Sequence, residues 1–82
     1  MKPFVKVIWH DAADEDRTWL KEADVKQFGE EPCEVVSWGW LVSKTPKYLT
    51  LAADFIPGTD TFGRVTKIPN GMLVSCEEYK QD

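Results

Sequence analysis

The fold is decided by Glu34-Val35-Val36-Ser37-Trp38-Gly39-Trp40-Leu41-Val42, because no other part of the chain holds so much apolar mass in one extended run. Successive side chains of a β-strand point to opposite faces of its sheet. One face of this strand is therefore expected to carry Val36, Trp38, Trp40 and Val42. Gly39, in the middle of the strand, is where a sharp bend costs least.

Four further segments have the composition of strands. Residues 4–9 form the first. Residues 47–56 alternate well and follow the central strand after a polar turn at 43–47, which predicts an antiparallel hairpin. Residues 64–68 and 72–76 are shorter strands. They are separated by Pro69-Asn70-Gly71, which predicts a tight turn of 3₁₀ type.

One helix is expected between the first two strands, at residues 18–28. Thr18 is suited to cap its N-terminus, and Gly29 is suited to end it. Its apolar stripe would consist of Trp19 and Ala23, with Leu20 and Phe28 beside them. A helix of about three turns does not persist alone, so we expect it to pack on the strands.

The fold class predicted from this pattern is mostly β. We expect a small, strongly bent antiparallel sheet or barrel, SH3-like or Sm-like, with the short helix between its first two strands. Residues 1–82 are long enough for one domain and too short for a second core. Chains of this size often add buried surface by self-association, so a homo-oligomer is expected.

Composition and charge exclude several classes of function. The chain has ten basic and fourteen acidic residues, a net charge of −4 and a pI near 4.9, which argue against binding to duplex DNA. No segment resembles a signal peptide or reaches membrane-spanning length, so a cytoplasmic protein without membrane contact is expected. Cys33 and Cys76 are interpreted as reduced thiols.

Catalytic and metal-binding chemistry find little support in the sequence. His10 and Asp11 are adjacent in a strand and point to opposite faces, and no nucleophile motif accompanies them. We therefore expect no enzymatic activity. The acidic segment 11–16 does not match the EF-hand pattern and is read as a solvated loop. No metal and no cofactor are expected.

The aromatic residues point to a binding surface. Four tryptophans in a chain this small are too many for one tiny core, and the surplus is expected on the surface or in an oligomer interface. The loop at 57–63 is either an ordinary hairpin loop or, together with the following arginine, an anion cradle. The candidate ligand-binding residues are Trp38, Trp40, Tyr48, Phe62, Arg64, Thr59 and Thr61.

The motifs of the chain also resemble a known group of proteins. They are Val7-Ile8-Trp9-His10-Asp11-Ala12, Trp19, the central strand at 36–42, Leu51-Ala52, and Ile68-Pro69-Asn70-Gly71-Met72-Leu73-Val74-Ser75. This pattern resembles small proteins encoded by tailed bacteriophages and prophages, over nearly the whole chain. The resemblance brings no catalytic residues. It implies a phage accessory protein that acts in the host cytoplasm on a host component or on a small defence signal.

Four hypotheses of function follow. The leading one is a non-enzymatic phage accessory binding protein, an anti-defence protein that sequesters a nucleotide-derived signal. The second is a protein–protein inhibitor that docks on a host enzyme through the region of Trp40. The third is an Sm-like binder of single-stranded nucleic acid, which the acidic pI disfavours. The fourth is a component of the virion.

Overall fold

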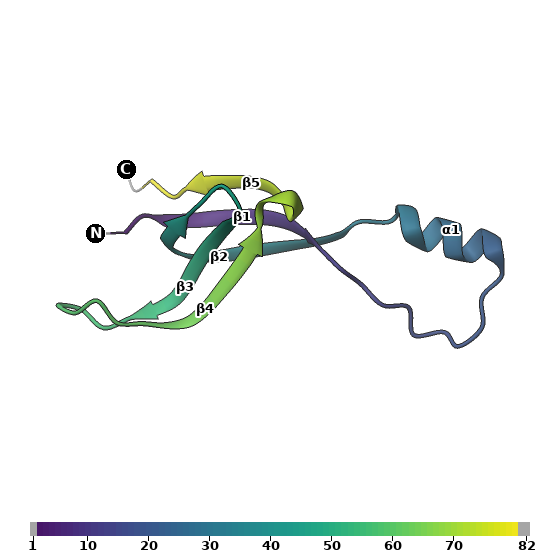
Figure 1. The fold of residues 1–82 in the computed structure, drawn as a ribbon, viewed down its shortest axis with the longest axis horizontal. Coiled ribbons are helices and arrows are strands. Elements are labelled where there is room, and N and C mark those ends of the chain that lie inside the picture. Colours follow the sequence, from purple (N-terminus) through teal and green to yellow (C-terminus); the bar gives the residue numbers. More distant parts are fainter. Residues whose placement is uncertain (1, 81–82) are drawn as a thin grey trace.

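The protein is built on one antiparallel sheet of five strands (Figure 1). The computed structural model describes residues 2–80. The strands follow one another in the sheet as β4-β3-β2-β1-β5. Their bounds are β1 (Phe4–Asp11), β2 (Cys33–Lys44), β3 (Tyr48–Phe55), β4 (Phe62–Pro69) and β5 (Leu73–Glu78). The prediction of a small, mostly β antiparallel fold with a helix between its first two strands is confirmed.

The sheet is not closed into a barrel. Among residues 2–80, β4 pairs only with β3 and β5 pairs only with β1. The predicted 3₁₀ turn is present as η1 (Asn70–Met72) and leads from β4 into β5. Asn70 fixes this turn, because its backbone N–H donates to the carbonyl of Lys47 at 2.9 Å and its side-chain amide donates to the carbonyl of Thr45 at 2.9 Å.

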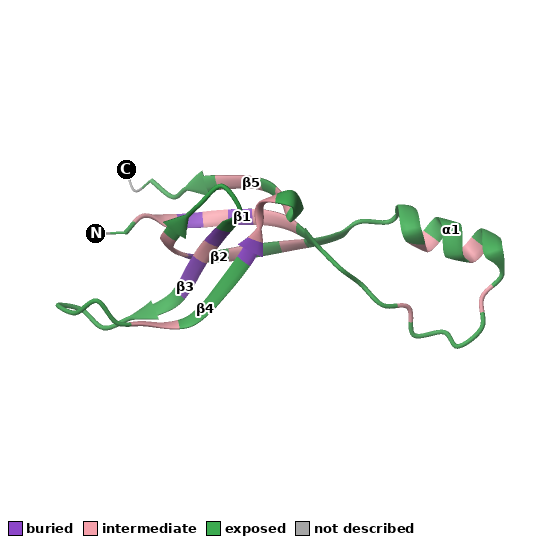
Figure 2. Ribbon diagram, in the orientation of Figure 1, coloured by how far each residue is buried: buried purple, intermediate pink, exposed green. Residues whose placement is uncertain are grey.

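The hydrophobic core lies on the inner face of the sheet. Figure 2 shows that the buried residues are confined to the strands. The core cluster comprises Val5, Val7, Leu49, Leu51 and Ile68, with Trp9, Leu41, Leu73 and Cys76 packed against it. Trp9 satisfies its indole N–H by donating to the hydroxyl of Ser37 at 3.0 Å, so the Ser37 face of β2 is the inner one. Trp38 and Trp40 therefore lie on the outer face.

Gly39 permits a close approach between β2 and β3. A β-carbon at this position would lie 3.0 Å from the carbonyl oxygen of Ala52 and 3.3 Å from the β-carbon of Leu51. The irregularity of the strand falls slightly later, where the register with β3 shifts between Leu41 and Ser43. A glycine is thus required here by packing, and the bulge follows it.

The helix departs from the prediction in both bounds and packing. It is α1 (Glu22–Glu30), its N-cap position is Lys21 without a side-chain cap, and Gly29 lies inside it. None of its residues is buried, and Trp19, expected in the buried stripe, is 91% exposed. The expectation that the helix packs on the strands was wrong.

The reason is the length of the β1–β2 pairing. It continues to Asp11 opposite Cys33, and the extended segment that follows carries the chain away from the sheet. Residues 12–32, called the arm below, project from one end of the molecule with α1 standing apart from the strands (Figure 1). The arm accounts for the elongated shape, whose extents are 55 × 26 × 25 Å.

Candidate ligand-binding site

An aromatic cluster on the outer face is centred on Trp40. Its ring meets Phe4 edge-on, with 4.9 Å between ring centroids, and meets Phe55 edge-on at 5.2 Å. Phe4 also stacks on Trp38 at 5.9 Å. The register explains the cluster, because Phe4 in β1 lies directly opposite Trp40 in β2, and directly opposed side chains of paired strands contact each other.

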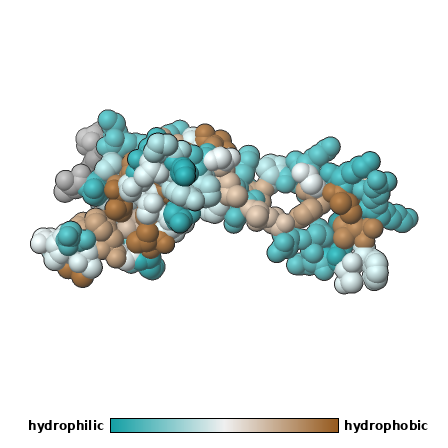
Figure 3. All heavy atoms as spheres, in the orientation of Figure 1, coloured by the Kyte–Doolittle hydropathy of each residue, from teal (hydrophilic) through white to brown (hydrophobic). Residues whose placement is uncertain are grey.

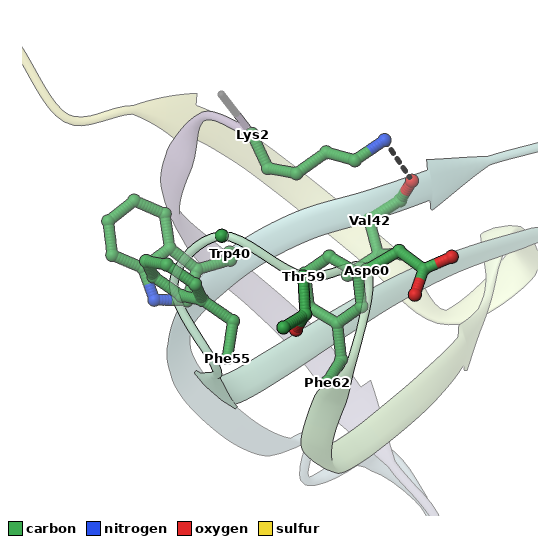
Figure 4. A pocket seen from close by; sticks show the side chains of 8 residues that line it. Lys2, Trp40, Val42, Phe55, Thr59, Asp60 and Phe62 are labelled. Carbon is green, nitrogen blue, oxygen red and sulfur yellow. Dashed lines mark hydrogen bonds between the residues drawn. The ribbon is translucent and has the colours of Figure 1, made fainter.

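A cavity of about 480 Å³ opens beside this cluster. We call it the Trp40 cavity. Figure 4 shows Trp40 and Phe55 together on one side of it, with Phe62 and Asp60 nearer the other. Its volume lies within the range of about 300–1,000 Å³ that is typical of small-molecule sites. The lining residues are Lys2, Trp40, Val42, Phe55, Gly58, Thr59, Asp60 and Phe62.

The loop between β3 and β4 forms one wall of the cavity and is braced internally. The backbone N–H of Ile56 donates to the carbonyl of Thr61 at 3.0 Å. The Thr59 hydroxyl donates to the Ile56 carbonyl at 2.7 Å and accepts the N–H of Thr61 at 3.1 Å. Gly58 adopts the left-handed φ of 79° that the turn requires. The wall is therefore formed before any ligand arrives.

This bracing bears on whether the loop is an ordinary hairpin loop or an anion cradle, the two alternatives that the sequence left open. The N–H of Thr61 binds the Thr59 hydroxyl, and the N–H of Thr59 lies 3.2 Å from the Ile56 carbonyl. Both donors are thus engaged within the loop and are not directed at a ligand. The loop therefore shapes the wall of the cavity, and these two N–H groups are not offered to a ligand.

Arg64 lies outside the cavity lining and is engaged elsewhere. Its guanidinium donates to both carboxylate oxygens of Asp54, at 2.6 and 3.0 Å, and the hydrogen bond lowers the pKa of Asp54 below its ordinary value. Arg64 also has a φ of 48°, a left-handed conformation that is uncommon outside glycine. The pair joins β3 to β4 next to the cavity loop, because the register places Asp54 opposite Gly63.

Two charged side chains line the cavity, and neither was among the residues predicted from the sequence. Lys2 extends along one edge, with its ammonium 3.4 Å from the carbonyl oxygen of Val42. Asp60 brings a carboxylate from the β3–β4 loop (Figure 4). Lys2 precedes the first strand, and only the pairing of β1 with β2 brings it beside Trp40. Sequence alone holds no signal for this proximity.

The seven predicted ligand-binding residues separate into four groups. Trp40, Thr59 and Phe62 come together in the cavity. Trp38 lies next to it on β2, behind Phe4, with the Lys6 ammonium 5.9 Å from its ring centroid.

Tyr48 is at the end of β3 that lies away from the cavity, where its ring centroid is 4.7 Å from the ammonium of Lys67. Thr61 and Arg64 maintain the loop and the hairpin, as described above.

The residues that raised the question of metal or nucleophile chemistry are dispersed. Cys33 lies opposite Asp11 and is exposed, and Glu15 binds Arg17 at 2.8 Å. Within residues 2–80, no group of three or more His, Cys, Asp or Glu side chains is placed to hold a metal ion. In the same part of the chain, no helix is both long and apolar enough to cross a membrane.

Comparison with known proteins adds no relative. No protein family matches the chain, and no curated protein sequence or solved structure matches it either.

Proposed function

We propose that the protein is a non-enzymatic binding protein that holds a planar, nucleotide-like small molecule in the Trp40 cavity. The observation that carries this proposal is a preformed cavity walled by Trp40, Phe55 and Phe62. Stacking of a nucleobase on an aromatic side chain contributes about 1–3 kcal/mol. Because the loop is already braced by Thr59, little ordering is needed on binding, which favours affinity.

The charges of the cavity limit the class of ligand. Lys2 supplies one ammonium, suited to a single phosphate group, and Asp60 supplies a carboxylate that can accept hydrogen bonds from N–H groups of a base. A carboxylate next to a single lysine disfavours a run of phosphates. The preferred ligands are therefore cyclic nucleotides and ADP-ribose derivatives, which carry less phosphate charge than nucleoside triphosphates.

The proposal also includes a biological role, that of a phage accessory protein. The resemblance to small phage and prophage proteins supports an accessory protein that acts in the host cytoplasm. Sequestration of a nucleotide-derived defence signal needs a binding cavity and no catalytic residue. A cavity with aromatic walls and two opposite charges meets that requirement.

Isothermal titration against a panel of cyclic nucleotides, ADP-ribose derivatives and nucleoside triphosphates tests this function. We expect heat with one cyclic or ADP-ribose ligand. Lys2→Ala should weaken its binding about tenfold, as the loss of one charge-assisted contact of 1.5 kcal/mol or so implies. The matched control Lys44→Ala removes a lysine at the end of β2, away from the cavity lining, and should bind as wild type. Absence of heat across the panel contradicts the proposal.

A protein partner is the second candidate, favoured by a separate observation. Trp38 is 52% exposed and Val36 is 48% exposed on the same face of β2, beside the cavity. Exposed aromatic and aliphatic side chains of this kind are enriched at the centres of protein interfaces. An inhibitor of a host enzyme would use this surface. Affinity purification from infected cells that recovers only the bait counts against it.

A further inference from the structure

The carboxylate of Asp60 is an unused hydrogen-bond acceptor in the wall of the Trp40 cavity. Within the part of the chain that the structure describes, it accepts no hydrogen bond and joins no ion pair, not even with Lys2, the other charged residue of the lining. The neighbouring carboxylate of the same hairpin differs, because the guanidinium of Arg64 binds Asp54 at 2.6 and 3.0 Å. Asp60 is thus free to bind a ligand.

The backbone on both sides of Asp60 is held in place before a ligand arrives. The Thr59 hydroxyl donates to the Ile56 carbonyl at 2.7 Å, and the Thr61 carbonyl accepts the N–H of Ile56 at 3.0 Å. The N–H of Thr61 donates in turn to the Thr59 hydroxyl at 3.1 Å. Because the loop needs little ordering on binding, its carboxylate can discriminate between ligands by the geometry of their hydrogen bonds.

Asp60 lies where the edge of a stacked ring would meet the loop. Figure 4 shows Trp40 and Phe55 on one side of the cavity, with Phe62 and Asp60 nearer the other. Figure 3 shows hydrophobic and hydrophilic residues together at the end of the β3–β4 hairpin, at lower left. A base that stacks on an aromatic side chain keeps the polar atoms of its edges available for hydrogen bonds. One such edge can therefore bind the carboxylate.

A carboxylate distinguishes the bases because it only accepts hydrogen bonds. Guanine carries two neighbouring donors on its Watson–Crick edge, the N1–H and the 2-amino group, which match the two carboxylate oxygens. Adenine and cytosine each have a ring-nitrogen acceptor beside the amino group, and uracil has a carbonyl oxygen on either side of its N–H. In these three bases a lone pair would face the carboxylate, which opposes binding.

We propose that the Trp40 cavity selects guanine, through hydrogen bonds from the guanine N1–H and 2-amino group to the carboxylate of Asp60. This inference rests on the proposed function and names the base within its class of ligands. Lys2 has a different role, because it is suited to the phosphate that all nucleotides share and so contributes affinity without selecting the base. The ligand is a guanine nucleotide of low phosphate charge, of which cyclic GMP is the simplest probe.

Calorimetric titration of wild type with cyclic GMP, cyclic AMP, cyclic CMP, cyclic UMP and cyclic IMP tests the selection, since these probes differ only in the base. Cyclic GMP should bind about tenfold or more tightly than the adenine, cytosine and uracil nucleotides. Cyclic IMP keeps the N1–H and lacks the 2-amino group, so its affinity should lie between. Equal affinities, or preference for another base, overturn the selection of guanine while nucleotide binding stands. No heat with any probe overturns both.

Three variants separate selection of the base from affinity for the phosphate. Asp60→Asn exchanges one acceptor oxygen for a donor, which suits adenine, so cyclic GMP should bind about tenfold more weakly and its advantage over cyclic AMP should disappear. Lys2→Ala should weaken both nucleotides by the same factor and leave their ratio unchanged. Asp16→Asn, which removes an exposed carboxylate in the arm, is the matched charge control and should bind as wild type.

Thermal unfolding of each variant accompanies the titrations. Asp60→Asn should unfold at the wild-type temperature, because no partner of Asp60 is lost. An Asp60→Asn protein that still prefers cyclic GMP overturns the proposal, as does a Lys2→Ala protein whose preference for guanine is lost. If Asp60→Asn fails to fold, the comparison of cyclic GMP with cyclic IMP on wild type still decides, and equal affinity for these two overturns the proposal.

Discussion

The indole of Trp40 meets the ring of Phe55 edge-on, with 5.2 Å between ring centroids and 88° between ring planes. Phe55 is the last residue of β3 and lies opposite Phe62, the first residue of β4. The three aromatic residues are thus held by strand pairing at the point where the hairpin leaves the sheet. The cavity exists because this pairing places rings around a loop that is braced by its own hydrogen bonds.

Replacing Phe55 by leucine tests the contribution of this contact to stability. Edge-to-face aromatic pairs contribute about 0.5–1.5 kcal/mol beyond their burial. Phe55→Leu should therefore lower the free energy of unfolding by about 1 kcal/mol, measured by denaturant titration. Tyr79→Leu, a change of similar size at an exposed residue beyond β5, is the control and should alter it little. Equal losses in the two variants would contradict the aromatic contribution.

Gly39 is the second test of the fold. The β-carbon of Gly39→Ala would meet the carbonyl oxygen of Ala52 at 3.0 Å, a backbone atom that cannot move alone. We expect the substitution to lower the free energy of unfolding by about 1–3 kcal/mol, as overpacking does. Gly71→Ala is the matched control, because its β-carbon would have no heavy atom within 4 Å. A Gly39→Ala protein as stable as the control would contradict the claim that the close approach of β2 and β3 requires a glycine at this position.

The Asp54–Arg64 pair predicts a dependence of stability on pH. The hydrogen bond from Arg64 lowers the pKa of Asp54 in the folded protein below its ordinary value of 3.8. The pair therefore stabilises the protein above that value, and its contribution is lost as the pH falls through the lowered pKa. Because both side chains are largely exposed, the effect is expected to be small.

Asp54→Asn gives the measurement for this pair. Near neutral pH the variant should unfold at a lower denaturant concentration than wild type. At strongly acidic pH, where the Asp54 carboxylate is protonated in both states, the two midpoints should converge. A difference that stays constant over the whole range would assign the destabilisation to something other than the ionised carboxylate.

The strands were predictable because successive side chains of a strand point to opposite faces of the sheet, and apolar and polar residues alternate in the sequence accordingly. The placement of Trp38 and Trp40 on one face of the sheet, and the turn at Pro69-Asn70-Gly71, follow from local pattern alone. The packing of the helix was not predictable in the same way. An apolar stripe indicates that a helix face is to be covered, and it does not indicate by which molecule. Trp19 shows this limit most clearly.

The candidate site was predictable to the extent that it depends on neighbours in one hairpin. Trp40, Thr59 and Phe62 meet because β3 is joined to β4 by a short loop and paired with β2. Lys2 enters through the pairing of β1 with β2, over a long sequence separation. Arg64, selected from the sequence as an anion ligand, is held by Asp54, a partner that only the strand register reveals.

The most direct measurement is a calorimetric titration of the nucleotide panel into three proteins: wild type, Trp40→Leu and Trp38→Leu. Both substitutions remove an indole from the outer face of β2 and keep an aliphatic side chain, yet only Trp40 lines the cavity. A ligand should bind wild type and Trp38→Leu with similar affinity and bind Trp40→Leu about tenfold or more weakly, as the loss of one stacking contact implies. No ligand in the panel, or equal affinity for all three proteins, would contradict binding in the Trp40 cavity.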